Sequence, residues 1–179
     1  MAGRDVTKVV NRVEDAKEDK NLDLSDCRLM KVPDAIFLLL KNTMLTCCNL
    51  SQNTLRSLPS KIGNRFTHLS ALILCDNQLT RLPNEIDGLC DLKTLDISNN
   101  SFAVIPQVIY RLQTLKTLHA EKNIIADIDV EKMTLMNKLA FVDVQENPLN
   151  EELRDELKRV TNIKILLTEK EEKAFEDID

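Results

Sequence analysis

Aromatic residues and glycine are both scarce in this chain of 179 residues. Tryptophan is absent, aromatic residues make up 3% of the sequence, and only three glycines occur. A core without large rings must be built from aliphatic side chains, chiefly Leu and Ile. The scarcity of glycine removes the glycine-rich phosphate loops of many enzymes, and neither H-E-x-x-H nor G-x-S-x-G is present. We therefore expect a protein that is not an enzyme.

The chain also lacks an excess of positive charge and a long apolar run. It has 29 acidic and 24 basic residues, a net charge of −5, whereas nucleic-acid binding depends on basic patches. The longest run of large apolar residues, Ile36 to Leu40, is far shorter than the roughly 20 residues of a membrane helix. Residues 1–20 are charged throughout, unlike a signal peptide. We expect neither a nucleic-acid nor a membrane partner, and a cytoplasmic location with the nucleus as an alternative.

The cysteines lack the spacing of a disulfide framework or a metal site. Their number is odd, and none of them forms a C-x₂-C pair. They are Cys27, Cys47, Cys48, Cys75 and Cys90. We expect reduced thiols, no cofactor and no metal ion.

A recurring asparagine defines an internal repeat. Leu stands eight positions before each copy, an apolar residue or Cys stands three and five positions before it in all but one case, and Leu, Phe or Ile stands two positions after it. The copies are 23 or 24 residues apart: Asn53, Asn77, Asn100, Asn123 and Asn147. A weaker copy has Asp19 in place of the first Leu, then Leu22 and Leu24, and Cys27 at the asparagine position. A fixed period of this length is typical of stacked repeats, here about six coils.

Each part of the repeat has a structural interpretation. Buried residues that alternate with polar ones before each asparagine indicate a short strand, and the long return to the next strand makes the sheet parallel. The asparagine amide can donate and accept, so the five copies are expected to form a structural ladder that satisfies backbone groups at the buried bends. Prolines on the return side favour extended backbone over long helices.

The frame L-x-x-L-x-L-x-x-N-x-L-x-x-L-P-x-x-I, as in Leu69 to Ile86, resembles the intracellular leucine-rich repeats of roughly 23 residues. The resemblance covers residues 21–150. Three segments, Leu22–Cys27, Val130–Met133 and Asn147–Asn150, are similar to a small all-repeat member of that family. The resemblance implies an α/β leucine-rich repeat solenoid, right-handed, with one parallel strand per coil on the concave face and capping helices. It further implies intracellular protein interaction and signalling, and it supplies no catalytic residues.

The two ends of the chain are expected to cover the ends of the stack. Residues 1–20 form an N-terminal helical cap, because valines recur at helical spacing over residues 5–18; a partner- or membrane-binding helix is the alternative. Residues 21–149 are the repeats. Residues 150–167 form a C-terminal cap, with a helix after Asn150 and a closing strand from Ile163 to Leu167. Residues 168–179 are an acidic tail.

The concave face, meaning the sheet face directed away from the core, is formed by the residues six, four and two positions before each asparagine. It is polar and acidic except for Ala71, Ile73, Cys75 and Phe141. Outward apolar residues within an acidic surface favour contact with a protein or peptide that carries basic residues; a merely solvated face is the alternative. The candidate partner-binding residues are Ile73, Asp96, His119, Glu121, Phe141 and Asp143.

His119 permits two further interpretations. It lies between Asp96 and Asp143 with Ser98 diagonal to it, which is compatible with a Ser/His/Asp relay or a carboxylate–imidazole metal site. A relay also needs an oxyanion hole and a cleft that excludes water, and an open sheet offers neither. We favour a pH-sensitive contact, since two carboxylates stabilise the imidazolium.

These patterns predict an interaction module that is a monomer on its own. It would be an adapter or regulatory subunit in intracellular signalling, binding through the concave sheet. The alternative is a structural subunit of a larger assembly, similar to the small repeat light chain of axonemal dynein, which would use its ends or its convex face.

Overall fold

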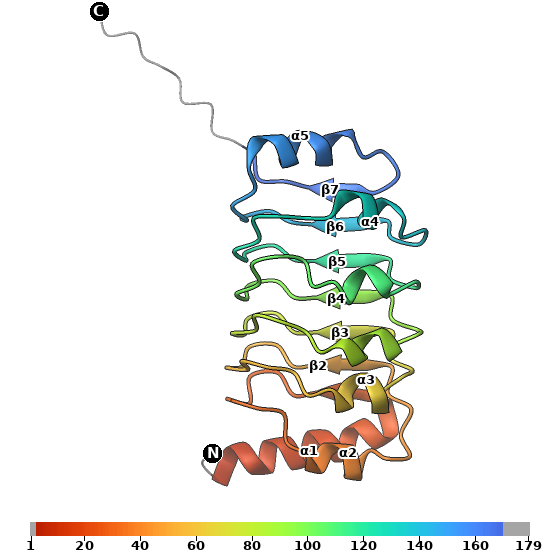
Figure 1. Cartoon of the computed structure of the whole chain (residues 1–179). Coiled ribbons are helices and arrows are strands. Elements are labelled where there is room, and N and C mark those ends of the chain that lie inside the picture. The colour runs from red at the N-terminus through yellow and green to blue at the C-terminus, as the bar shows by residue number, and fades with distance from the viewer. Residues whose placement is uncertain (1–2, 170–179) are drawn as a thin grey trace, which may run out of the picture.

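The computed structural model describes residues 3–169, in which short parallel strands form one sheet whose order follows the sequence (Figure 1). Each strand therefore pairs with the preceding and following coils. The strands are β1 (Asn21–Asp23), β2 (Cys47–Asn49), β3 (Ala71–Ile73), β4 (Thr94–Asp96), β5 (Thr117–His119), β6 (Phe141–Asp143) and β7 (Lys164–Leu166). The predicted α/β solenoid with one strand per coil is confirmed, and β7 is the predicted closing strand.

The return segments contain only short helices, which lie opposite the strands in Figure 1. Proline before or at the start of the return removes an N–H and fixes φ, so a long helix does not form. In the coil with Asp129 in place of proline, the Asp129 side chain caps the return helix by accepting a hydrogen bond from the Lys132 N–H. The return helices are α2 (Ala35–Leu39), α3 (Lys61–Arg65), η1 (Asn84–Gly88), η2 (Ile109–Arg111) and α4 (Val130–Thr134).

Longer helices lie at the two ends of the stack (Figure 1). At the N-terminal end, α1 (Gly3–Asp19) packs on β1 and buries Val9, Val13 and Ala16. Val6 and Val10 remain about half exposed, because residues spaced by four and three positions form the buried stripe. At the other end, α5 (Glu151–Arg159) begins at Asn150, whose side chain accepts from the Leu153 N–H. Most of the predicted acidic tail, residues 170–179, lies outside the described residues.

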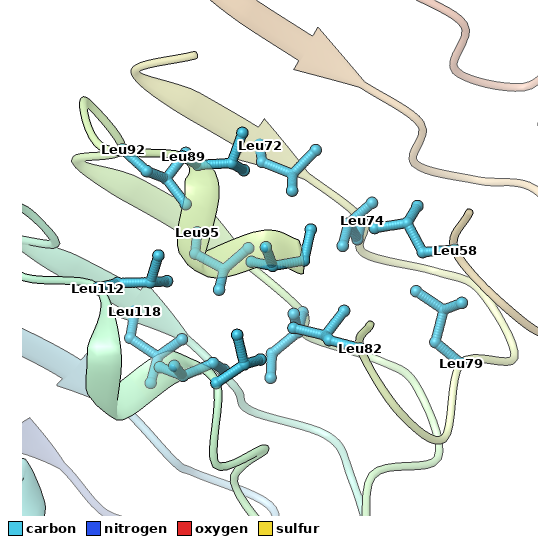
Figure 2. Packing of buried hydrophobic residues seen from close by; sticks show 14 of the residues in the cluster. Leu58, Leu72, Leu74, Leu79, Leu82, Leu89, Leu92, Leu95, Leu112 and Leu118 are labelled. Carbon is cyan, nitrogen blue, oxygen red and sulfur yellow. The ribbon is translucent and has the colours of Figure 1, made fainter. Parts of the chain in front are cut away.

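The core consists of layers of leucine contributed by successive coils (Figure 2). Leu72, Leu95 and Leu118 come from neighbouring strands and stack along the solenoid axis, while Leu89 and Leu112 enter from the return side. All five are buried, each burial contributing about 1.5–3 kcal/mol. No helix among the described residues has both the length and the apolar character to span a membrane.

Each repeat asparagine connects two coils through its side-chain amide. The Asn100 Nδ2 donates to the Ile97 and Ser98 carbonyls of its own coil and to the Leu74 carbonyl of the preceding coil. Its Oδ1 accepts from the Leu79 N–H at 2.9 Å. The same pattern of contacts recurs at Asn53, Asn77, Asn123 and Asn147.

In the first coil, Cys27 occupies the asparagine position and α1 supplies the missing donors. Arg12 donates to the Ser25 carbonyl at 2.5 Å, and Lys8 donates to the Asp26 carbonyl at 2.5 Å. The Cys27 thiol also donates to the Ser25 carbonyl, at the longer sulfur distance of 3.4 Å. The cap helix therefore provides hydrogen bonds as well as apolar cover.

Candidate functional site

The strand register forms two straight columns of outward side chains on the concave face, and the third predicted column lies just beyond the strand ends. Ile73 pairs with Asp96, Asp96 with His119, and His119 with Asp143. Phe141 pairs with Thr117 on one side and with Lys164 of the closing strand on the other. The columns follow from the period of two along each strand, so the register that was predicted from the asparagine spacing is the one observed.

Not every side chain of these columns is accessible. The expectation that all of them point to solvent is wrong for Asp143, which is only 9% exposed, and for Ser51 and Ser98, which are also buried. The Asp143 carboxylate accepts a hydrogen bond from the N–H of Gln145, two residues further along the chain, at 3.0 Å. Asp96 makes the same bond to the Ser98 N–H. This local turn, typical of Asp and Asn, draws side chains in the middle column toward the backbone.

Ile73 cannot form such a bond and lies in a half-buried apolar spot. Its neighbours are Ala71 on the same strand and Cys75 just beyond the strand end, both half-buried. Burial raises the pKa of the Cys75 thiol to about 12, and the carboxylates of Asp96 and Asp76 add to the shift. The thiol is therefore protonated and uncharged at neutral pH, so it extends the apolar spot.

A second cluster surrounds Phe141 near the C-terminal end of the sheet. The His119 ring lies beside the Phe141 ring, with centroids 5.4 Å apart and planes tilted by 50°. On the other side, the Lys164 ammonium is 5.9 Å from the Phe141 centroid. Phe141 is half-buried and has these two neighbours.

His119, Glu121 and Asp143 converge where β5 and β6 end. The His119 Nδ1 is 3.8 Å from the Glu121 Oε2, and one potential ligand atom from each of the three residues lies within 4.8 Å of the others. Burial raises the pKa of the Glu121 carboxyl above its usual value, and the charges of Asp143 and Asp96 raise it further. The Glu121 Oε2 has lost contact with solvent and has no hydrogen-bond partner among residues 3–169.

The Ser/His/Asp interpretation does not match this geometry. The Ser98 hydroxyl donates to the Asp96 Oδ1 at 2.6 Å, so it is engaged with a carboxylate instead of the imidazole. Asp96 and Ser98 are thus hydrogen-bonded to each other and not to His119. The carboxylate that approaches the imidazole from its own coil is Glu121, two residues further along the chain, with 3.8 Å between the His119 Nδ1 and the Glu121 Oε2.

A stack of parallel strands with buried leucine layers and an asparagine bridging each pair of coils is a leucine-rich repeat solenoid. The sequence matches the family described as "Leucine-rich repeat region" over residues 22–178. The chain belongs to this family.

Individual relatives support the same conclusion. The chain is 33% identical to mouse leucine-rich repeat-containing protein 20 and 36% identical to the human protein, each over 156 residues and 85% of both chains. This is the small all-repeat protein indicated by the three segments quoted above. The crystal structure of internalin C2 from Listeria monocytogenes has a TM-score of 0.55 at 24% identity, covering 73% of this chain and 65% of that chain, and it shows the shared fold.

Two features of the site had only weak sequence signals. The local turn that buries Asp143 needs an Asp or Asn side chain that accepts from the N–H two residues later. Asp96 and Ser98 form the same pair, so the only signal in the sequence is an Asp or Asn at this outward position. The approach of Glu121 to His119 follows from their spacing of two residues, which places both on one face.

Proposed function

We propose that the chain is an adapter or regulatory subunit that binds a protein partner through its concave sheet. Membership of the leucine-rich repeat family supports a protein-interaction module. The finer parts of this proposal are binding by the concave face, the participating residues, a role in signalling and a cytoplasmic or nuclear location. All five cysteines are unpaired, which fits a reducing compartment.

The observation that carries the proposal is the apolar spot at Ile73 next to an acidic column. Ile73 is directly paired with Asp96 across neighbouring strands, and Glu121 follows on the same face. Partly buried apolar anchors contribute most of the energy at interfaces, while charges of one sign select and steer the partner. The fitting partner is a segment with basic residues next to an apolar anchor.

Among the predicted contact residues, accessibility separates direct from indirect roles. Ile73, Asp96, His119, Glu121 and Phe141 are all half-buried and keep some surface for a partner. Asp143 is buried, so in this proposal it acts through its charge and by orienting its neighbours.

Binding by the concave face is tested with matched pairs of variants in quantitative capture of partners from native extract. Ile73→Glu should reduce capture of a specific partner by at least about tenfold, as expected for loss of an anchor. Leu135→Glu introduces the same charge at an apolar residue of the return side that is 68% exposed, and it should have little effect. Asp96→Lys should slow association with the partner, and the effect should be largest at low salt. Glu85→Lys, on η1 of the return side, should leave the association rate unchanged.

The opposite pattern would favour the structural-subunit alternative. Exposed apolar side chains also occur away from the concave face, with Leu38 75%, Met44 63% and Leu135 68% exposed. Leu38 belongs to α2, at the N-terminal end of the stack (Figure 1). If Leu135→Glu or Leu38→Glu abolished capture while Ile73→Glu did not, the convex face or an end would be the functional surface.

A further inference from the structure

Three metal-ligating side chains are held together by rigid parts of the sheet. His119 ends β5 and Asp143 ends β6, and the two residues are direct partners in the parallel register. Glu121 follows His119 by two residues, so the alternation along the chain directs it to the same face. Because neighbouring strands lie only about 4.8 Å apart, this register brings the imidazole and two carboxylates to one point.

The donor atoms of these three residues favour one class of metal ion. One imidazole nitrogen with two carboxylate oxygens suits zinc and similar transition metals, whereas magnesium and calcium prefer sites made entirely of oxygen. Three protein ligands with an open fourth position is a common arrangement for zinc, with metal–ligand distances of about 2.0–2.2 Å. The ligand atoms of such a site lie about 3.3–3.6 Å apart. The observed separation of 3.8 Å between the His119 Nδ1 and the Glu121 Oε2 is therefore only slightly too long.

The cluster contains a polar atom that lacks a partner. Buried polar atoms are nearly always hydrogen-bonded, so an exception needs an explanation. The Glu121 Oε2 is such an exception among residues 3–169, and the nearest chargeable nitrogen, on His119, lies beyond hydrogen-bond distance. Within the same range, no Lys or Arg side chain forms an ion pair with Glu121 or Asp143. We propose that His119, Glu121 and Asp143 bind a divalent transition-metal ion of the zinc type.

Neighbouring groups hold the three ligands in place. The Phe141 ring packs against the imidazole at a centroid distance of 5.4 Å and limits its rotation. The Gln145 N–H donates to the Asp143 Oδ1, which orients that carboxylate. Asp96 adds negative charge near the site but is already hydrogen-bonded to Ser98, so it serves as a surrounding group and not as a ligand. Supporting contacts of this kind are what a preorganised metal site requires.

Bound metal would change the concave face without enclosing a reaction site. A dication between two carboxylates would remove most of the local negative charge, and water or a partner side chain would complete its coordination. The metal site and the proposed partner surface therefore overlap in space. Metal binding can nevertheless be tested without any partner, so the two proposals fail independently.

The test is titration of Zn²⁺ into the full, metal-free chain, followed by calorimetry and by a thermal melt. We expect one ion per chain and a higher melting temperature with metal. Each of the near-isosteric changes His119→Asn, Glu121→Gln and Asp143→Asn should weaken binding by at least about tenfold, since loss of even an outer contact of a metal ligand costs about 10–100-fold. Circular dichroism of each metal-free variant checks that it remains folded.

Matched controls separate this site from other zinc-binding groups. His68 and Asp91 form an imidazole–carboxylate pair on the return side, with 3.3 Å between the Nδ1 and Oδ2, so His68→Asn removes a similar group elsewhere. The double variant Cys75→Ser with Cys90→Ser removes a half-buried thiol of the concave face and the exposed thiol. Neither control should change the affinity, and the visible spectrum of bound Co²⁺ should lack a thiolate charge-transfer band.

Four results would overturn the proposal. Unchanged affinity in all three ligand variants would show that the metal binds elsewhere, as would loss of binding only in the cysteine or His68 controls. Binding that needs millimolar Zn²⁺ would be adventitious. Ca²⁺ or Mg²⁺ binding as tight as that of Zn²⁺, with no effect of His119→Asn, would mean that the carboxylates alone form the site.

Discussion

At the level of single residues, the bend after each strand depends on a backbone conformation that the chain adopts without glycine. The residue immediately before each repeat asparagine has a positive φ, for example 56° at Gln52 and 55° at Lys122. A side chain in the left-handed region costs about 1–2 kcal/mol, and glycine avoids this cost. None of the three glycines lies at these positions.

Gln52→Gly should therefore stabilise the protein. Relief of the left-handed strain exceeds the roughly 0.5–1 kcal/mol of extra chain entropy that glycine loses on folding, for a net gain of up to about 1 kcal/mol. Gln52 is exposed, and its substitution removes no packing. Urea unfolding measures the change. Gln52→Val places a β-branched residue at the same φ and should destabilise, so an equal response to both changes would rule out the conformational explanation.

The repeat asparagine should matter more than any exposed asparagine. Asn100→Ala leaves the Leu79 N–H and several buried carbonyls without their partner and should cost on the order of 1–3 kcal/mol in urea unfolding. Asn137→Ala, at an exposed position with no side-chain hydrogen bond among the described residues, should cost well under 1 kcal/mol. Asn99, although exposed, is an unsuitable control because its φ is 48°. Equal costs for Asn100 and Asn137 would remove the ladder as a source of stability.

At the level of elements, α1 completes a hydrogen-bond pattern that Cys27 leaves incomplete. Arg12 and Lys8, one helical turn apart, reach the carbonyls of Ser25 and Asp26. Arg12→Ala should lower the free energy of unfolding by about 1–3 kcal/mol, the usual range for a hydrogen bond from a charged group. Lys17→Ala is the control on the same helix, since within residues 3–169 Lys17 pairs with Glu14 alone, at the surface. Its effect should stay below about 1 kcal/mol. Similar losses for both variants would indicate a general effect on helix formation.

The N-terminus of α4 should make stability depend on pH. The hydrogen bond from the Lys132 side chain lowers the pKa of the Asp129 carboxyl, and the Lys132 N–H adds to this shift. A lowered folded-state pKa means that stabilisation is present above the unfolded value, near 3.8, and is lost as pH falls through the folded value. Asp129→Ala should lower the melting temperature at neutral pH, and the difference from the parent chain should shrink in acid. A difference that is constant with pH would exclude the charge of Asp129 as its cause.

The extent to which the sequence predicts the elements depends on periodicity. The strands and the closing strand could be predicted because buried Leu and Asn recur at fixed spacing, and each strand inherits its register from its neighbour. The burial of Asp143 could not be predicted in this way, because it depends on a local turn in which the side chain binds a backbone N–H. The spacing of the valines predicts the helix but not which of them are buried, and the buried stripe of α1 runs through Val9, Val13 and Ala16.

For the whole molecule, the stack is quasi-one-dimensional, since each coil contacts chiefly the coils before and after it. Interior coils are covered on both sides, whereas the first coil depends on α1 for one of its faces. Deleting residues 1–18 should uncover the core around Leu22, Leu24 and Leu29, lower the melting temperature and promote aggregation. The damage should begin at the N-terminal coils, which hydrogen exchange resolves along the chain.

Paired substitutions on α1 distinguish the loss of its apolar contacts with the first coil from the loss of the helix itself. Val9→Ser with Val13→Ser removes two buried contacts and should reproduce much of the deletion, costing at least about 2 kcal/mol. Val6→Ser with Val10→Ser makes the same chemical change on the exposed side of the same helix and should leave the melting temperature nearly unchanged. If the exposed pair were as damaging as the buried pair, α1 would stabilise the protein through a second contact surface instead of by covering the first coil.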